Sequence, residues 1–179
     1  HAIARVIEPV FDRTFIHDVW SCRKNRGTHR AVERFQHMAW GLSRNNTRTV
    51  WVLKLDIYHF FDSVDQDILL GILIRVFSEP SLVSLLEKII RSFPHGIPLG
   101  NLTSHLFANV YLNALDQFVK HRLHAEYYLR YCDDCFVLNI DKVVLQNIAR
   151  EIDHFLGERL HLTIHPAKIF LSRYHRGVD

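Results

Sequence analysis

Apolar residues recur at helical spacing through the first part of the chain. The first predicted helix has a kink or break expected at Pro9, and its apolar positions are Ile3, Val6, Ile7, Val10 and Phe11. A polar, basic loop follows it. A second helix is predicted to begin at Thr28, a residue type that caps helices. Its inward-facing residues are Val32, Phe35, Ala39 and Leu42.

Residues 50–57 alternate between two faces, as a β-strand does. One face carries Trp51, Leu53, Leu55 and Ile57. The other face carries Val50, Val52, Lys54 and Asp56. An acidic residue therefore ends the strand on a face that it shares with apolar neighbours.

Two helices are predicted after this strand. Ser63 and Gln66 form the pattern of a capping box, which predicts a helix over residues 64–76. Pro80 opens another helix, which is expected to end near Phe93.

A loop and a long helix are predicted next. Residues 94–103 contain two glycines and two prolines, so they are expected to form the loop. The helix is predicted to start at Thr103 or Ser104. Its apolar stripe consists of Phe107, Val110, Tyr111, Ala114, Phe118 and Val119.

The last third of the chain predicts a hairpin, a helix and two strands. Residues 126–131 and 135–140 are expected to pair as a β-hairpin with Asp133 and Asp134 at or near its tip. Asp141 is expected to cap a helix that ends near residue 156. Two short strands, residues 160–165 and 169–171, are predicted around the sequence Pro166-Ala167-Lys168. The whole order is the split β-α-β-β-α-β pattern, which predicts an α+β fold with one antiparallel sheet and helices on one face.

Composition narrows the possible classes of protein. The 179 residues carry a formal net charge of +3 and a pI near 8.9, which is compatible with nucleic-acid binding without identifying it. No apolar run approaches the ~20 residues needed to span a membrane. Three cysteines give no disulfide framework, and Cys132 and Cys135 lack a second ligand pair for zinc. The first residue, His1, is not a methionine, so we expect the sequence to be a piece of a longer protein.

The acidic residues at the strand end and the hairpin tip suggest a metal site. Paired central strands would bring Asp56 close to Asp133 and Asp134, and clustered carboxylates destabilise a fold unless a cation neutralises them. Mg²⁺ prefers such hard oxygen ligands, and two ions can stabilise both oxygens of a phosphoryl displacement. For any one of these residues, an ordinary acidic side chain at a turn or strand end remains the alternative.

Three segments resemble the sequence motifs of reverse transcriptases. Residues 56–64, Asp-Ile-Tyr-His-Phe-Phe-Asp-Ser-Val, resemble the first catalytic motif, and residues 131–134, Tyr-Cys-Asp-Asp, resemble the Tyr-x-Asp-Asp box. Residues 96–104, Gly-Ile-Pro-Leu-Gly-Asn-Leu-Thr-Ser, resemble the loop that precedes the helix between them. The likeness is to bacterial retroelement enzymes, most of all those of diversity-generating retroelements, with group II intron and retron enzymes as alternatives. His105 stands where the diversity-generating enzymes usually have Gln.

The resemblance implies a right-hand polymerase palm, which has a ferredoxin-like antiparallel sheet, together with part of the fingers. Residues 1–49 would be the partial fingers segment and residues 50–179 the palm, with helices between fingers and palm at about residues 64–93. Further fingers and a thumb are expected outside this sequence.

The resemblance also implies the roles of the site residues. Asp56, Asp133 and Asp134 would hold two Mg²⁺ ions, for which Mn²⁺ could substitute, and the carbonyl of Ile57 would be a further ligand. Lys168 resembles the lysine that protonates the leaving pyrophosphate, although a solvated surface lysine is the plainer interpretation.

The implied nucleotide site contains Phe61, Leu99 and Gly100. Phe61 stands at the place of the bulky residue that excludes a 2′-hydroxyl, while core packing is the alternative for Phe60 and Phe61. Leu99 replaces a frequent Gln, which suggests looser nucleotide selection or a neutral variant.

Template and primer phosphates would be held by basic residues on both sides of Gly27. The implied nucleic-acid contacts are Arg23, Lys24, Arg26, Arg30 and Tyr131. The implied partners are an RNA template, a DNA primer, deoxynucleoside triphosphates and an accessory protein of the retroelement, with no membrane. A cytoplasmic protein of a bacterium or phage is expected.

Two kinds of alternative stay open from the sequence. An RNA-dependent RNA polymerase or a nucleotidyl cyclase could use a related palm, although Phe61 and the loop at residues 96–104 argue against them. A palm-derived nucleic-acid-binding or scaffold module would need no carboxylates, yet all three are present.

Overall fold

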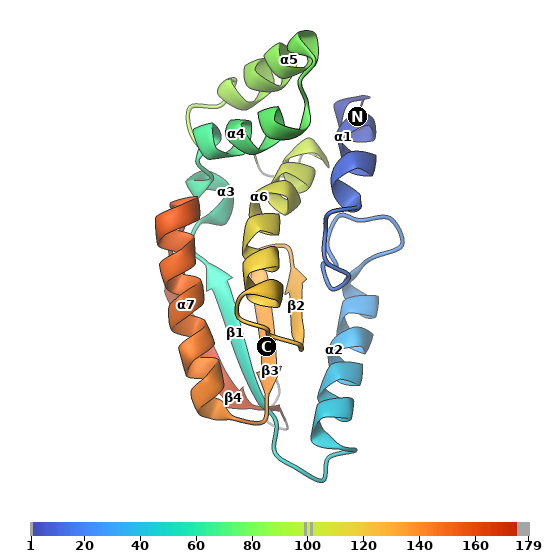
Figure 1. Cartoon of the computed structure of the whole chain (residues 1–179), viewed down its shortest axis with the longest axis vertical. Helices are drawn as coiled ribbons and strands as arrows, with labels where there is room; N and C mark the ends of the chain where they lie inside the picture. Colours follow the sequence, from blue (N-terminus) through green and yellow to red (C-terminus); the bar gives the residue numbers. More distant parts are fainter. Residues whose placement is uncertain (1, 99, 101, 175–179) are drawn as a thin grey trace.

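A four-stranded antiparallel sheet forms the centre of the protein, in the order β2-β3-β1-β4 (Figure 1). The computed structural model describes residues 2–98, 100 and 102–174. The strands are β1 (Trp51–Ile57), β2 (Tyr128–Tyr131), β3 (Asp134–Asn139) and β4 (Ile164–Arg173). The predicted α+β class with a single antiparallel sheet is confirmed.

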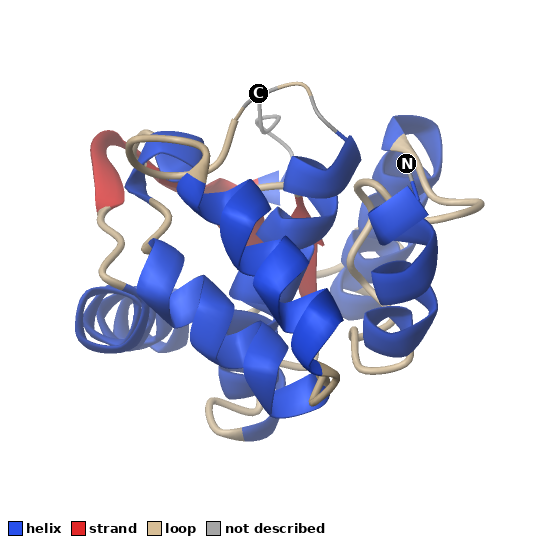
Figure 2. Cartoon of the chain, turned by 90° about the horizontal axis from the view of Figure 1, so that it is seen from above, coloured by secondary structure: helices blue, strands red, loops and turns tan. Residues whose placement is uncertain are grey.

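Helices surround this sheet and hide most of it when the molecule is viewed from above (Figure 2). They are α1 (Ala2–Asp12), α2 (Thr28–Ser43), α3 (Phe60–Ser63), α4 (Gln66–Val76), α5 (Pro80–Arg91), α6 (Leu102–His121) and α7 (Lys142–Leu160). Helices α6 and α7 cover one face of the sheet through the main hydrophobic core. Within the described part of the chain, no helix has the length and apolar character needed to cross a membrane.

The alternation predicted for β1 separates two hydrophobic cores. Leu53, Leu55 and Ile57 face α6 and α7, and each is at most 2% exposed. Burial of such side chains contributes roughly 1.5–3 kcal/mol each. Val50 and Val52 face the other way and pack with α2, so α2 covers part of the opposite face. Asp56 belongs to this second face, the one that α2 covers only in part.

The predicted capping box at Ser63 and Gln66 is wrong. Ser63 ends the short helix α3, and α4 is capped by Asp65, whose carboxylate accepts hydrogen bonds from the backbone N–H groups of Asp67 and Ile68. A carboxylate at this position satisfies two of the N–H groups that a helix start leaves without partners.

Two other predicted helix starts are shifted. Thr28 is the first residue of α2, and the preceding Gly27 is the cap residue, without a side-chain hydrogen bond. Helix α6 already begins at Leu102, so Thr103 and Ser104 lie inside its first turn. The helices exist because their apolar faces pack on the sheet, and local capping preferences did not decide their bounds.

The break predicted at Pro9 is wrong, since α1 runs through this residue. Pro9 cannot donate to the carbonyl of Arg5, but both residues are exposed. Water can therefore satisfy that carbonyl, while Ala4, Ile7 and Phe11 on the other side stay buried in the main core.

The end of the chain also differs from the prediction. Asp141 caps α7 as expected, accepting from the N–H of Val143 at 2.7 Å. However, α7 continues to Leu160, and a single strand, β4, replaces the two predicted strands and runs through Pro166.

A bulge explains how β4 accommodates its proline. Leu55 pairs with Ile169, whereas Ile57 pairs with Ile164, so Asp56 alone faces four residues of β4. The unpaired residues need no ladder donor, which is why a proline is tolerated there. The bulge lies directly beside the first candidate carboxylate.

Candidate active site

The two central strands bring the candidate carboxylates together. Leu55 of β1 pairs with Cys135 of β3, and one further step along this antiparallel register sets Asp56 opposite Asp134. The alternation of both strands directs these two side chains to the face that α2 partly covers. Residues far apart in the sequence thus become neighbours at one end of the sheet.

The hairpin between β2 and β3 places the third carboxylate at its turn. Tyr131 and Asp134 form the last pair, so Cys132 and Asp133 are the two turn residues. Cys132 has a φ angle of 55°, in the left-handed region that favours glycine. A non-glycine residue held there costs roughly 1–3 kcal/mol and persists only when its surroundings fix it.

Asp134 lies in an environment that opposes its charge. Burial raises the pKa of Asp134, and against the opposing effect of Lys54, the carboxylates of Asp133 and Asp56 raise it further. Its Oδ1 atom is buried and has no hydrogen-bond partner. A buried carboxylate oxygen without a hydrogen bond, beside two other carboxylates, is the environment that a bound cation stabilises.

Two lysines lie among these carboxylates. Lys168 of the β4 bulge donates to Oδ2 of Asp56 at 2.9 Å, and Nζ of Lys54 lies 3.9 Å from Oδ1 of Asp134. The contact with Asp56 raises the pKa of Lys168, so its amine is protonated at neutral pH. The structure therefore places Lys168 beside Asp56, and its role as a general acid stays a prediction.

The arrangement of Asp56, Asp133 and Asp134 supplies only part of the ligands that a hard divalent cation needs. Among residues 2–98, 100 and 102–174, no three His, Cys, Asp or Glu side chains form a group that could hold a metal ion alone. The carboxylates of Asp56 and Asp134 are instead contacted by lysines. Mg²⁺ often takes one or two carboxylates together with waters and substrate phosphates, so the donor set suits a site completed by its substrate.

Phe61 lies in the short helix α3, five residues after Asp56. Its neighbour Phe60 is 2% exposed and belongs to the main core, whereas Phe61 is half-buried. The ring of Phe61 meets that of His105 edge-on, with centroids 5.8 Å apart, and Nδ1 of His105 is buried without a partner. Both rings therefore pack against the main core, and only Phe61 is open enough to be a candidate for nucleotide contact.

The loop after α5 holds the backbone of Phe61. The N–H of Ile97 donates to the carbonyl of Phe61 at 2.8 Å. Gly96 has a φ angle of 61°, and a Cβ there would lie 2.2 Å from the same carbonyl oxygen. Gly100 is exposed and has a φ angle of 88°, while Leu99 lies outside the described residues. Only glycine fits at residue 96.

The basic loop before α2 divides into inward and outward side chains. Arg23 faces inward, where its Nε donates to Asp12 at 2.6 Å and its Nη1 donates to the carbonyl of Ile16 at 2.9 Å. These bonds fix the loop from within the protein, and the phosphate contact expected of Arg23 stays a prediction. Lys24 is exposed, and so is Arg30 in the first turn of α2, although Arg30 also donates to the carbonyl of Asn25.

Arg26 is the remaining basic residue of this loop. Its guanidinium lies over the ring of Trp20, 4.4 Å from the centroid. Burial lowers its pKa, with a further contribution from Arg23. The contact leaves the guanidinium half-buried beside an aromatic ring rather than free in solvent.

A pocket of about 340 Å³ lies between α2 and the sheet, with Asp134 in its wall. Tyr131 lines it, and its hydroxyl is 2.9 Å from the hydroxyl of Thr28 at the start of α2. Aromatic residues Phe35, Phe136 and Tyr174 form much of the remainder. The pocket thus offers ring surfaces next to the carboxylates.

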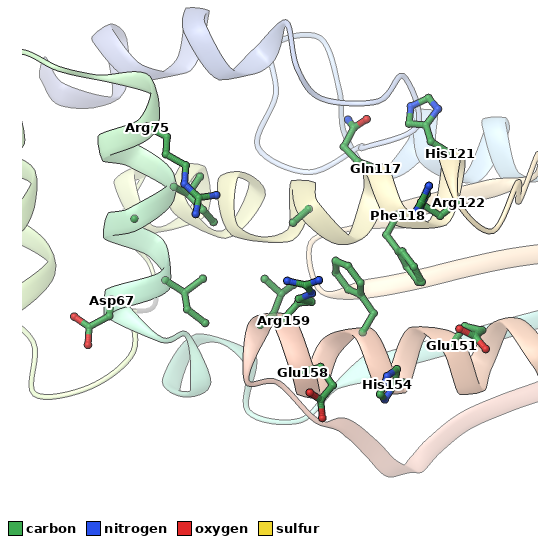
Figure 3. Close-up of a pocket in the computed structure, with 16 residues that line it drawn as sticks. Asp67, Arg75, Gln117, Phe118, His121, Arg122, Glu151, His154, Glu158 and Arg159 are labelled. Atoms are coloured by element: carbon green, nitrogen blue, oxygen red, sulfur yellow. The ribbon is translucent and has the colours of Figure 1, made fainter.

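A larger hollow of about 1080 Å³ lies elsewhere, between α4, α6 and α7 (Figure 3). Phe118 and Phe155 stack in its floor, and Arg75, Arg122 and Arg159 stand among its walls. None of the candidate site residues that the structure describes lines it. Its size alone therefore does not mark the site of the chemistry.

The pair Cys132 and Cys135 shows no sign of redox or metal chemistry. Burial raises the pKa of Cys132 to about 12, and burial likewise raises that of Cys135 to about 12. A thiol is a nucleophile or metal ligand only as a thiolate, so both behave as small apolar residues at neutral pH.

Several residues around the site escaped the sequence analysis. Lys54 shares the strand face of Asp56, and this alternation could have indicated its role. Arg130 and Asp116 form a completely buried ion pair beneath the hairpin. Arg130 lies in an apolar strand and Asp116 in a helix with an apolar stripe, and this context could have indicated that each is buried. The local sequence does not indicate that they pair.

The comparisons agree with the motifs. A sequence model of the family described as "Reverse transcriptase (RNA-dependent DNA polymerase)" matches residues 1–178. Protein YkfC of Escherichia coli is 27% identical over 131 residues, covering 68% of this chain and 34% of YkfC. The group II intron-encoded protein LtrA of Lactococcus lactis is 24% identical over 128 residues, covering 66% of this chain and 20% of LtrA. The chain therefore spans about a third or less of these relatives.

Solved structures show the same fold. Apo telomerase from Candida tropicalis superposes with a TM-score of 0.74 over 99% of this chain and 37% of its own, at 11% identity. A form truncated from the C-terminal domain gives a TM-score of 0.75 at 12% identity. At such low identity the likeness concerns the fold alone, and it agrees with the expected palm and fingers arrangement.

Proposed function

The chain belongs to the reverse transcriptase family, and we propose that it carries the catalytic centre that extends a DNA 3′-hydroxyl on an RNA template. The substrates would be deoxynucleoside triphosphates, and pyrophosphate would leave. The observation that supports this most is the meeting of Asp56, Asp133 and Asp134 at one end of the sheet, on two strands and the turn between β2 and β3.

Asp56, Asp133 and Asp134 would hold the divalent ions that this family generally uses, proposed here to be two Mg²⁺ ions with Mn²⁺ as a substitute. The carbonyl of Ile57 is the further ligand proposed from the sequence. The bound ions would neutralise charge on the attacking and leaving oxygens. The exposed edge of the carboxylate group, open to solvent at Lys168, gives the triphosphate access.

Lys168 is proposed to act as the general acid that protonates the leaving pyrophosphate. Its protonated amine contacts Asp56 in the substrate-free protein and lies on the exposed bulge of β4. With divalent ions held by Asp56, the amine of Lys168 would no longer be paired with this carboxylate and could donate its proton to the leaving pyrophosphate. General acid catalysis of this kind contributes roughly 10²–10⁴-fold.

Phe61 would select the sugar by bulk, since its ring is only half-buried and its backbone is held by residues 96–97. Leu99 and Gly100 stay proposed nucleotide contacts from the motif. Lys24, Arg26, Arg30 and Tyr131 are proposed to face the template and primer.

The retroelement subtype stays a prediction. The residues at positions 99–104 favour the diversity-generating enzymes, while LtrA among the relatives keeps the group II intron type as the alternative. The division into a fingers segment at 1–49 and a palm at 50–179, and an accessory protein partner, are likewise proposals.

Primer extension tests the proposed function. The protein should extend a DNA primer on an RNA template with deoxynucleotides and Mg²⁺, and Asp133→Asn should reduce the rate at least a hundredfold. Asp153→Asn, which removes an exposed carboxylate on α7, is the matched control and should retain full activity. Normal extension by Asp133→Asn would refute the site assignment. Absence of extension by the wild-type protein as well would refute the proposed function.

A further inference from the structure

A buried polar network lies beneath the hairpin turn that carries Asp133. The ion pair between Arg130 of β2 and Asp116 of α6 is fully buried, with two bonds of 2.8 and 2.7 Å between guanidinium and carboxylate. The hydroxyl of Tyr128 donates to the same carboxylate at 2.8 Å. Asp116 thus receives three hydrogen bonds, which offsets the cost of burying its charge.

The guanidinium also reaches the turn itself. Nη1 of Arg130 donates to the carbonyl of Cys132 at 2.6 Å and to Oδ1 of Asn109 at 3.1 Å. Asn109 is buried and donates in turn to the carbonyl of Ser21 at 2.9 Å. One rigid, planar side chain therefore connects α6, β2 and the turn.

The other side of the same turn residue is held by Ser21. The N–H of Cys132 donates to the Ser21 hydroxyl at 2.8 Å, and Ser21 is 6% exposed. Residues 18–20 run parallel to the edge of β2, since Arg130 donates to the carbonyl of Asp18 and accepts from the N–H of Trp20, both at 2.9 Å. Arg34 of α2 secures this segment by an ion pair with Asp18 at 2.7 Å.

Both polar groups of the Cys132 backbone are therefore fixed from within the protein. This is the residue with the left-handed φ angle, a conformation that needs such support. The peptide that follows it leads into Asp133, and Asp134 comes next. Fixing the Cys132 backbone therefore fixes the direction of the two carboxylates.

We propose that Arg130 and Ser21 are positioning residues that clamp the Cys132 backbone and thereby aim Asp133 and Asp134 at the divalent ions. The proposal rests on the proposed function, because it assigns these carboxylates to metal. Arg130 contacts neither metal nor substrate in this scheme. It acts as an outer partner of the metal ligands, and removal of such partners typically lowers metal affinity 10–100-fold.

Two variants test the clamp. Arg130→Lys keeps the charge but loses the planar fork, and Ser21→Ala removes the acceptor of the Cys132 N–H while leaving the ion pair intact. Each should raise the Mn²⁺ concentration that half-saturates the protein about tenfold, measured by electron paramagnetic resonance of free Mn²⁺. Hydrogen exchange at the Cys132 amide should accelerate in Ser21→Ala by a similar factor.

Ile152→Val is the matched control, because it perturbs a fully buried residue of α7 away from the turn. It should lower thermal stability without changing Mn²⁺ affinity or exchange at Cys132. In primer extension, the clamp variants should need more Mg²⁺ for half-maximal rate and regain most of the rate at saturation. A purely structural role would instead lower the maximal rate at an unchanged Mg²⁺ requirement.

The outcomes separate the clamp from the function on which it depends. Unchanged Mn²⁺ affinity and unchanged Cys132 exchange in folded Ser21→Ala would overturn the clamp, even if Arg130→Lys failed to fold. Wild-type protein that neither binds Mn²⁺ nor extends primers would overturn the proposed function and the metal role of the clamp with it. If the Cys132 amide of that wild-type protein is protected from hydrogen exchange, the contacts of the clamp are present, and only the proposed function is refuted.

Discussion

Asp134 is held in a position where its negative charge is unfavourable. Because the folded state raises its pKa, the fold prefers the protonated form, and ionised Asp134 destabilises the metal-free protein at neutral pH. This destabilisation disappears as the pH falls through the raised pKa toward the ordinary value of 3.8. A residue that costs stability in this way is typical of a functional site.

Asp134→Asn should therefore stabilise the metal-free protein at pH 7 while weakening its response to metal. We expect a melting temperature roughly 2–4 °C higher, the shift that about 1 kcal/mol produces in a chain of this size. Thermal melts at pH 7 and pH 4 measure this, and the gain should shrink at the lower pH. A lower melting temperature for the variant at pH 7 would contradict the electrostatic description.

Phe61 offers a test of sugar selection at the same scale. Phe61→Ala should raise ribonucleotide incorporation relative to deoxynucleotide incorporation roughly tenfold or more, because the steric barrier to a 2′-hydroxyl is removed. Single-nucleotide extension assays with each substrate give the ratio. Phe118→Ala, which removes a half-buried ring on the far side of α6, should leave the ratio unchanged. Equal ratios in both variants would assign Phe61 to packing.

The three carboxylates were predictable because their signals are local: a strand alternation for Asp56 and a turn between apolar strands for the other two. The lysine at residue 168 was predictable only through the family likeness. The approach of Lys168 to Asp56 depends on the β4 bulge, and the residues around Lys168 do not predict a bulge. Arg130 and Asp116 were not predictable as a pair, because their contact depends on how α6 packs on β2.

Among the elements, the loop between α5 and α6 packs against α3, which carries the proposed nucleotide contact Phe61. Gly96 passes so close to α3 that a side chain would meet the backbone of Phe61 and Asp62. The side chain of Gln66, at the start of α4, donates to the carbonyls of Phe93 and Gly96 at 3.1 and 3.0 Å. The loop is therefore a fixed part of the structure from residue 93 to residue 97.

Gly96→Ala should destabilise the protein by about 1–3 kcal/mol, since it combines a left-handed backbone with a backbone clash. Urea unfolding provides the measurement. Gly157→Ala is the control, because Gly157 lies inside α7 with open space around it and should gain roughly 0.5–1 kcal/mol. Equal stability of the two variants would contradict the close approach of this loop to α3.

Element positions were more predictable than element ends. Apolar periodicity located every helix longer than one turn that the structure describes, since burial of an apolar face decides whether a helix forms. Capping choices were less predictable, because Asp65 and Ser63 are both good caps and tertiary packing selects between them. The continuity of β4 through Pro166 could not be foreseen, because a bulge depends on the partner strand.

At the scale of the whole molecule, the two faces of the sheet have different roles. Helices α6 and α7 seal one face, and the carboxylates lie on the other, which α2 covers only in part. The order of strands and helices in the sequence predicted helices on one face of the sheet. It did not predict that α2 packs on the other face. The basic loop before α2 lies on the same side as the site through its contacts with the hairpin.

Binding of an RNA–DNA duplex should accordingly depend on this loop and on salt. Lys24→Ala combined with Arg30→Ala should weaken binding and reduce the slope of log affinity against log salt by about 1 for each phosphate that the protein no longer neutralises. Arg150→Ala, an exposed change on α7, is the control and should leave the slope unchanged. An identical slope in the double variant would exclude these residues from the nucleic-acid surface.

Diffraction from the protein with primer, RNA template, a non-hydrolysable deoxynucleotide and Mn²⁺ tests the central claim most directly. Anomalous scattering locates Mn²⁺ without reference to the protein structure. The account predicts peaks within coordination distance of Asp56 and Asp133, close to Asp134, with Lys168 moved away from Asp56. Peaks elsewhere on the protein, or none beside these three carboxylates, would contradict it.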